Sequence, residues 1–168
     1  NNEMDALLSK YTTFKLEADL STLSDNNKKM IPILIEAAKI MDDLFWYEAY
    51  GDKKTFMDGL KDEKTKAFAN INYGPWDRLN GNAPFVAGVG DKPLGANYYP
   101  ADMTKDEFEK ADLEGKSDLY TFIRRNDDGS LNTVPYHEQF KEEVTRASKL
   151  LAEAAELADE EGLKRYLE

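Results

Sequence analysis

Hydrophobic residues recur with a helical period along the first part of this chain. The first long stretch begins after Ser24 or Asp25, either of which is a suitable N-cap, and Gly51 would end it. Pro32 lies early enough to fit the first turns or to mark a slight kink. Shorter helices are expected around 53–60 and 62–70. The spacing predicts one long amphipathic helix with an apolar stripe, made of Met30, Leu34, Ala37, Met41, Leu44 and Phe45.

A second helical period occupies the end of the chain. Pro135 suits the first turn of this last long helix. Gly162 is expected to break the helix, and residues 163–168 would begin another one. A capping box of Thr104 and Glu107 predicts a short helix through about Ala111. The apolar face of the long helix is predicted to consist of Phe140, Val144, Ala147, Leu151, Ala154 and Ala158.

Between these helical parts lies a candidate β-hairpin. Residues 119–124 are rich in strand formers, residues 126–129 read Asn-Asp-Asp-Gly, and residues 131–134 would form the return strand. Asn, Asp and Gly tolerate the backbone angles of tight hairpin turns. The sequence therefore predicts one small hairpin in this region.

Residues 72–101 differ in kind from the rest. They hold four of the six prolines and five of the ten glycines, so no regular helix or strand is expected there. Five aromatic residues argue against a flexible linker: Tyr73, Trp76, Phe85, Tyr98 and Tyr99. The sequence thus predicts a mainly α fold, with residues 1–168 as a single helical domain or lobe segment. It would carry a long irregular Gly/Pro/aromatic loop and one small β-hairpin.

Charge narrows the classes of partner. The 168 residues include 33 acidic and 22 basic ones, which gives a net charge of −11. Such a surface repels nucleic acid and anionic membranes. The longest apolar run, residues 30–35, is too short to span a bilayer. A soluble protein is expected. The chain begins without Met, so we expect that its natural N-terminus was removed, either from an exported (periplasmic or lipoprotein) precursor or by trimming of a cytosolic one.

Metal-binding and nucleophilic motifs are incomplete. The absence of Cys excludes disulfides and thiolate ligands. His137 precedes Glu138, as in the zinc-binding helix motif His-Glu-x-x-His. That motif needs a second His four residues after the first, where this chain has Lys141. His137 is therefore expected to be a surface or capping residue at a helix start, and no metal site is predicted in this chain. No motif for a nucleophilic Ser accompanies the single His. With so many acidic residues, a catalytic pair of carboxylates cannot be assigned from the sequence.

The sequence contains neither a calcium-binding EF-hand loop nor a phosphate-binding loop, because the required residues are missing at key positions. Placing the glycine of the hairpin turn at the sixth position of an EF-hand puts Arg124 and Pro135 where Asp and Glu are required. A dinucleotide fingerprint in the 88–95 stretch would need Gly at Pro93, and a P-loop would need Lys at Ala96. Neither cofactor class is expected.

The remaining candidate site is the start of the irregular loop. An Arg beside aromatic residues on a rigid loop could line a groove for a peptide or sugar, with Arg78 available to a carboxylate. In the other interpretation, Trp76 fills a gap in the core while Asp77 and Arg78 pair locally. Both interpretations stay open. The candidate substrate-binding residues are Asn72, Tyr73, Trp76, Asp77 and Arg78.

Four stretches carry a family resemblance. NYGPWDRLNGN (72–82), GVGDKPLGANYYPADMT (88–104), YTFIRRNDDG (120–129) and VPYHE (134–138) resemble bacterial relatives of dipeptidyl peptidase III, a zinc-dependent metallopeptidase family. The resemblance extends over about residues 20–168 and is most specific in the loop.

What the resemblance implies is limited by what the chain lacks. Those enzymes bind zinc through a helix with two His and a catalytic Glu, plus a further Glu, and none of these motifs occurs here. The resemblance therefore implies a non-catalytic N-terminal lobe segment, inactive alone, that helps to form or cover a peptide cleft. Its partner would be the catalytic lobe of the same polypeptide, where the zinc would be bound, and a C-terminus at a starting helix fits truncation. The alternative hypothesis is a free-standing helical module that binds a peptide or protein without enzymatic activity.

Overall fold

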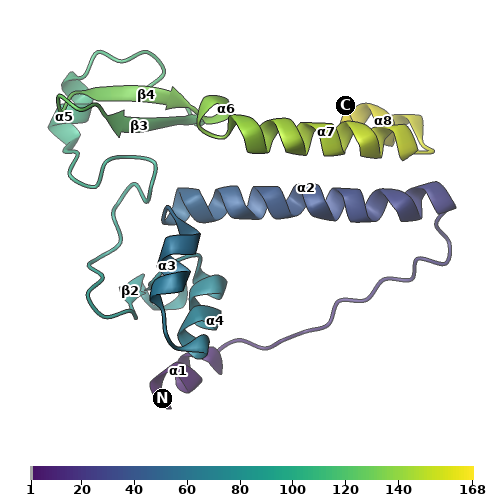
Figure 1. Ribbon diagram of the computed structural model, residues 1–168, viewed down its shortest axis with the longest axis horizontal. Helices are drawn as coiled ribbons and strands as arrows, with labels where there is room; N and C mark the ends of the chain where they lie inside the picture. The colour runs from purple at the N-terminus through teal and green to yellow at the C-terminus, as the bar shows by residue number, and fades with distance from the viewer. Residues whose placement is uncertain (1) are drawn as a thin grey trace. The chain divides into compact units, whose positions relative to one another are not determined.

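Helices make up 51% and strands 8% of the computed structural model, which describes residues 2–168 (Figure 1). The predicted mainly α fold is confirmed. The chain divides into two compact units. One, called the loop unit, contains the residues up to Thr13 and Phe45–Pro135; the other, called the helical unit, contains Phe14–Leu44 and Tyr136–Glu168.

Eight α-helices and four short strands are assigned in the described residues. The helices are α1 (Asn2–Leu8), α2 (Asp25–Ala49), α3 (Lys53–Gly59), α4 (Glu63–Asn72), α5 (Lys105–Lys110), α6 (Tyr136–Gln139), α7 (Lys141–Leu157) and α8 (Glu161–Leu167). The strands are β1 (Trp76–Asp77), β2 (Ala83–Pro84), β3 (Thr121–Arg125) and β4 (Leu131–Pro135), and the 3₁₀ turn η1 covers Arg78–Asn80. None of the described helices is both long and apolar enough to cross a membrane.

Helices α2 and α7 run antiparallel in the helical unit (Figure 1). The side chain of Asp159, just after α7, accepts hydrogen bonds from Ser24 and Asn26 at the start of α2. Ser24 is also the N-cap, because its hydroxyl accepts the Asn27 N–H at 3.0 Å. Within the helical unit, the buried side chains on these two helices are Met30, Ala37, Ile40 and Leu44 of α2 and Ala147, Ala154 and Ala155 of α7.

The predicted stripe of α2 is shifted at its C-terminal end. Met41 and Phe45 are each 42% exposed, whereas Ile40, which the prediction omitted, is 2% exposed. The buried positions follow the spacing of Met30, Ala37 and Leu44, so Ile40 lies on their line and the next residue lies one position around the helix. The prediction placed Met41 instead of Ile40 between Ala37 and Leu44, and it added Phe45, which lies beside the buried face.

Two helix boundaries also differ from the prediction. The last long helix is divided, because Phe140 leaves the helical region between α6 and α7 with φ −115° and ψ 36°. Gly162 does not break a helix; it lies in the first turn of α8, and the break comes at Ala158, which is extended. Asp159 follows this break, and its bonds to the start of α2 hold the chain in the turn. A third difference is that residues 12–20, in a zone predicted to be helical, form neither helix nor strand.

The loop unit has an aromatic core. Trp46, Phe68 and Phe122 are 0–1% exposed. The ring of Phe85, in the irregular loop, meets the ring of Phe68 at 4.6 Å, and Tyr98 stacks on Phe122 at 4.9 Å. Phe85 and Tyr98 of the irregular loop therefore pack against this core, whereas Tyr99 is 38% exposed.

The predicted hairpin is confirmed as β3 and β4, which pair antiparallel with Phe122 opposite Val134. Gly129 in the turn has φ 86°, an angle that glycine adopts without strain. A second, unpredicted pair lies inside the irregular loop, where β1 and β2 join Trp76 to Pro84. Its turn is closed by the Asn82 N–H, which donates to the Asp77 carbonyl at 2.9 Å.

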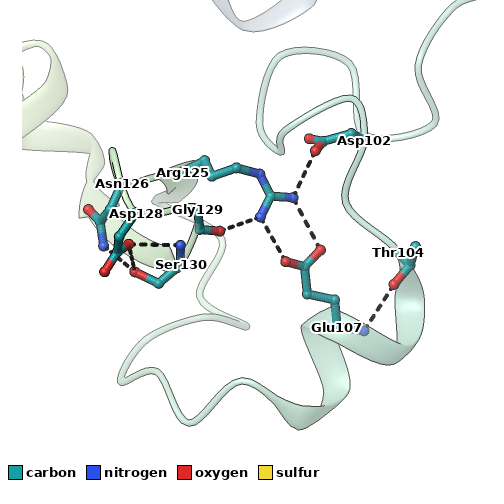
Figure 2. Close-up of polar contacts among 8 residues, drawn as sticks. All are labelled: Asp102, Thr104, Glu107, Arg125, Asn126, Asp128, Gly129 and Ser130. Carbon is teal, nitrogen blue, oxygen red and sulfur yellow. Dashed lines mark hydrogen bonds and ion pairs between the residues drawn. The ribbon is translucent and has the colours of Figure 1, made fainter.

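Helix α5 is tied to the hairpin through Arg125 (Figure 2). The Thr104 hydroxyl accepts the Glu107 N–H at 3.1 Å, so this half of the capping box is confirmed. The Glu107 carboxylate instead accepts two bonds from Arg125, at 2.8 and 3.2 Å, and Arg125 also donates to the Gly129 carbonyl at 2.6 Å. A bidentate charged pair is stronger than the single amide bond of the capping box. Asp102 lies 3.2 Å from the same guanidinium.

Candidate functional site

The irregular loop begins with an unusual helix end. Tyr73, the C-cap of α4, has the left-handed angles φ 56° and ψ 38°. This region costs a non-glycine residue roughly 1–2 kcal/mol. The ring of Tyr73 meets the ring of Phe45 edge-on at 4.7 Å, and this contact helps to offset the strain.

Asn72 fixes Arg78 at two points. Its side-chain oxygen accepts the Arg78 backbone N–H at 2.9 Å, and its backbone carbonyl accepts the Arg78 Nε–H at 3.0 Å. The Asn72 amide also donates to the Phe68 carbonyl at 3.0 Å, inside α4. Because Asn72 is only 3% exposed, these bonds compensate for burying its amide.

Asp77 is buried and pairs with a residue outside the loop. It is 2% exposed, and its side chain accepts the Leu79 N–H at 3.0 Å. The other carboxylate oxygen lies 3.6 Å from Nζ of Lys10. The expected local pairing of Asp77 with Arg78 is thus replaced by pairing with a residue far away in the sequence.

Trp76 lies in the core of the loop unit and is 7% exposed. Its indole N–H donates to the Gly90 carbonyl at 2.9 Å, and its ring centroid is 5.7 Å from that of Tyr50. The ammonium of Lys92 lies 5.9 Å from the ring. Trp76 therefore links the start of the loop to Gly90 and makes a cation–π contact with Lys92.

Arg78 is exposed at the surface of this cluster. Its guanidinium carbon lies 5.3 Å from the ring centroids of both Phe45 and Tyr73. The contacts described above hold the exposed Arg78 in place against its packed neighbours. Whether they bind a ligand stays a prediction.

A cavity of about 720 Å³ adjoins the loop. Its lining includes Lys92, Asp91, Gly95, Tyr98 and Tyr99. Burial, followed by the nearby charge of Arg78, lowers the pKa of Lys92. Burial, followed by the negative charge of Glu48, raises the pKa of Tyr98 to about 12. The cavity wall therefore joins a cation to two aromatic rings.

Sequence reasoning missed Lys92 and Phe45. Residues 72–101 contain only two cationic residues, Arg78 and Lys92. This scarcity is the signal in the sequence that could have drawn attention to Lys92. Phe45 was assigned to the helix stripe, and nothing local in the sequence indicates that it would flank Arg78 instead.

The described residues contain no group of three His, Asp or Glu side chains placed to hold a metal ion. His137 is exposed in α6, with Lys141 one turn later. The His, Asp and Glu side chains of the described residues therefore do not fit a zinc centre.

Comparison with solved structures identifies the relatives of this fold. The structure of DPP III from Caldithrix abyssi matches 97% of this chain with a TM-score of 0.89 and 36% identity. This chain is similar to the N-terminal third of a dipeptidyl-peptidase III. Dipeptidyl-peptidase III from Corallococcus sp. strain EGB matches 98% of the chain, with a TM-score of 0.86 and 32% identity. The resemblance inferred from the sequence is confirmed.

The match covers 33% of each dipeptidyl-peptidase III chain, so this chain spans about a third of their length. Nudix hydrolase 3 of Arabidopsis thaliana is 25% identical in an alignment 222 positions long that covers 95% of this chain and 29% of that protein. No protein-family model matches the chain.

Proposed function

We propose that this chain is a non-catalytic N-terminal lobe segment of a zinc-dependent, dipeptidyl-peptidase III-like hydrolase. It helps to form or cover a peptide cleft, and it has no activity alone. Its partner is the catalytic lobe of the same polypeptide, and the zinc is bound in that lobe. Residues 1–168 act as one lobe segment in this proposal.

The observation that carries the proposal is the extent of the structural match. Nearly the whole chain, 97–98%, superimposes on only 33% of each dipeptidyl-peptidase III. The donor set described above supports the same division, because the chain's own residues do not fit zinc. A hydrolase of this kind would therefore draw its metal and its catalytic Glu from another part of the polypeptide.

Within this lobe, the irregular loop is the proposed cleft surface. Five residues make up the proposed substrate-binding site: Asn72, Tyr73, Trp76, Asp77 and Arg78. Asn72, Trp76 and Asp77 are buried, so their role is to hold the loop in shape. The exposed Arg78 and the half-buried Tyr73 would contact the peptide. A binding surface on a rigid base loses less conformational freedom when a ligand arrives.

The test uses the natural polypeptide that contains this chain. We expect a mass several-fold above 19.1 kDa, about one bound zinc, and release of dipeptides that a chelator abolishes. Hydrogen–deuterium exchange with a non-hydrolysed peptide should protect residues 72–101. The matched comparison is the hairpin turn at 126–129, which should exchange equally with and without peptide.

Two results would contradict the proposal. A natural protein of about 19.1 kDa without zinc would favour the free-standing binding module instead. Protection confined to residues beyond Glu168 would remove the cleft role while leaving the lobe assignment. The isolated chain should release no dipeptide; chelator-sensitive release by it would also refute the proposal.

A further inference from the structure

The connection between α1 and α2 contains an exposed segment, residues 12–20, that belongs to neither a helix nor a strand (Figure 1). Its apolar side chains are exposed as well, since Phe14 is 79%, Leu16 88% and Leu20 43% exposed. Flexible linkers are rich in Gly and Ser, and stiff ones in Pro, but none of these occurs at positions 12–20. The composition therefore indicates a segment that packs against a partner.

Apolar and polar side chains alternate along this segment. The apolar set is Phe14, Leu16, Ala18 and Leu20, and the polar set is Thr13, Lys15, Glu17 and Asp19. A strand places every second side chain on the same face, whereas a helix would turn Phe14 and Leu16 to nearly opposite sides. The Lys15 ammonium pairs with the Glu17 carboxylate, so two residues of the polar set lie on one side. This alternation is typical of a strand with one buried face.

The backbone of the segment also lacks partners. Within the part of the chain that the structure describes, no backbone N–H of residues 12–20 donates a hydrogen bond. Of its carbonyls, only that of Leu20 accepts one there, from the Leu23 N–H at 3.1 Å. A row of unpaired N–H and C=O groups is the feature through which one strand pairs with another. An apolar surface alone would fit many partners, but this row selects an extended backbone.

We propose that residues 12–20 form a β-strand in the complete polypeptide, paired with a strand from outside residues 1–168. The inference rests on the proposed function, because it takes the partner strand from the rest of the same hydrolase. This chain covers 33% of each dipeptidyl-peptidase III, so about two-thirds of such a polypeptide is available to supply that strand. Pairing buries the apolar set and leaves the polar set in water. The partner strand therefore presents apolar side chains to Phe14 and Leu16.

The test is hydrogen–deuterium exchange of the natural polypeptide that contains this chain, with fragmentation that resolves single amides. A synthetic peptide of residues 12–20 gives the exchange rate of the same sequence without a partner. We expect at least every second amide of the segment to exchange at least about a hundredfold more slowly in the polypeptide. Protection of alternate amides indicates an edge strand, and protection of all of them indicates a strand with two neighbours.

Variants of the polypeptide assign the protection to the apolar set. Leu16→Glu and Phe14→Glu should each accelerate exchange of the protected amides by roughly ten- to hundredfold, the range expected for losing the burial of one large apolar side chain. The matched control is Thr13→Glu, which adds the same charge in the polar set and should change exchange by less than about threefold. Leu16→Ile keeps an apolar side chain and should retain the protection. Exchange of α7 is compared first, so that global unfolding is not counted as a local loss.

Three results would overturn the inference. They are exchange of residues 12–20 as fast as in the peptide, equal sensitivity to Thr13→Glu and Leu16→Glu, and loss of protection on dilution. The last result would assign the pairing to a second copy of the chain. Fast exchange in a polypeptide that binds zinc and releases dipeptides would leave the proposed function intact. A natural protein of about 19.1 kDa without zinc would instead refute the proposed function, and this inference with it, because no strand outside the chain would exist.

Discussion

Replacement of Asn72 by alanine should destabilise the loop unit. Asn72 is the residue through which α4 holds the start of the irregular loop, with one side-chain bond to the Phe68 carbonyl and one from the Arg78 N–H. The substitution removes both bonds and leaves the backbone of the helix unchanged. It therefore measures how strongly this single amide fixes the loop.

The magnitude follows from these two bonds. Each lost bond costs about 1 kcal/mol net, and a buried N–H left without a partner adds about 1–2 kcal/mol more. Alanine is a better helix former than asparagine by about 0.5 kcal/mol, which offsets part of the loss. We expect the free energy of unfolding to fall by about 2.5–3.5 kcal/mol.

Urea unfolding followed by tryptophan fluorescence is a suitable assay, because both tryptophans, Trp46 and Trp76, lie in the loop unit. The control is Asn70→Ala, which changes the same residue type on the same helix at an exposed position. Its effect should stay within about 0.5 kcal/mol. If the two variants unfold at the same urea concentration, the role assigned to Asn72 is refuted.

Three further predictions address the loop and the hairpin. Gly95→Ala should cost about 1–3 kcal/mol in thermal unfolding, because its new methyl group would collide with an aromatic ring of the loop. Gly90→Ala faces open space, so an equal loss there would contradict this packing argument. The Arg125 guanidinium holds the pKa of Glu107 below its usual value of 4.5, so this pair stabilises the fold above that pH and the contribution is lost as pH falls through the lower value. Melting temperatures measured down an acid series should depend less on pH in Glu107→Gln; an unchanged profile would refute the link. The pKa of Tyr98 is raised to about 12, so its contribution to stability is complete below pH 10 and lost as pH rises toward 12. Alkaline absorbance titration should lose its component near pH 12 in Tyr98→Phe, and an unaltered titration would count against burial of that hydroxyl.

Features set by neighbours in the sequence were predicted well. Ser24 begins α2, the turn at 126–129 joins β3 to β4, and the Thr104 hydroxyl caps α5. Each depends on residues within a few positions of one another, where backbone angles and side-chain reach decide the outcome. The division of the last helix at Phe140 has no such local signal, since phenylalanine is an ordinary residue within a helix.

The contacts of the candidate site residues could not be predicted from the sequence. Its residues adjoin one another in sequence, so their proximity could be expected. The burial of Asp77 could not, because its partner Lys10 lies in a distant segment. Likewise, the two rings around Arg78 include Phe45, which lies on another helix. Burial of a polar side chain depends on such distant partners, and one sequence does not reveal them.

The irregular loop is closed by bonds to segments on both sides of it, and this affects the order of folding. The Asn97 N–H donates to the Glu48 carbonyl at 2.9 Å, and the Ile123 N–H donates to the Tyr98 carbonyl at 2.9 Å. Contacts between residues this far apart require chain closure before they contribute stability. During synthesis, the end of the loop stays unfinished until β3 has left the ribosome, whereas α2 and α4 can form earlier. The loop should therefore be among the last parts of its unit to become protected in pulsed hydrogen-exchange refolding.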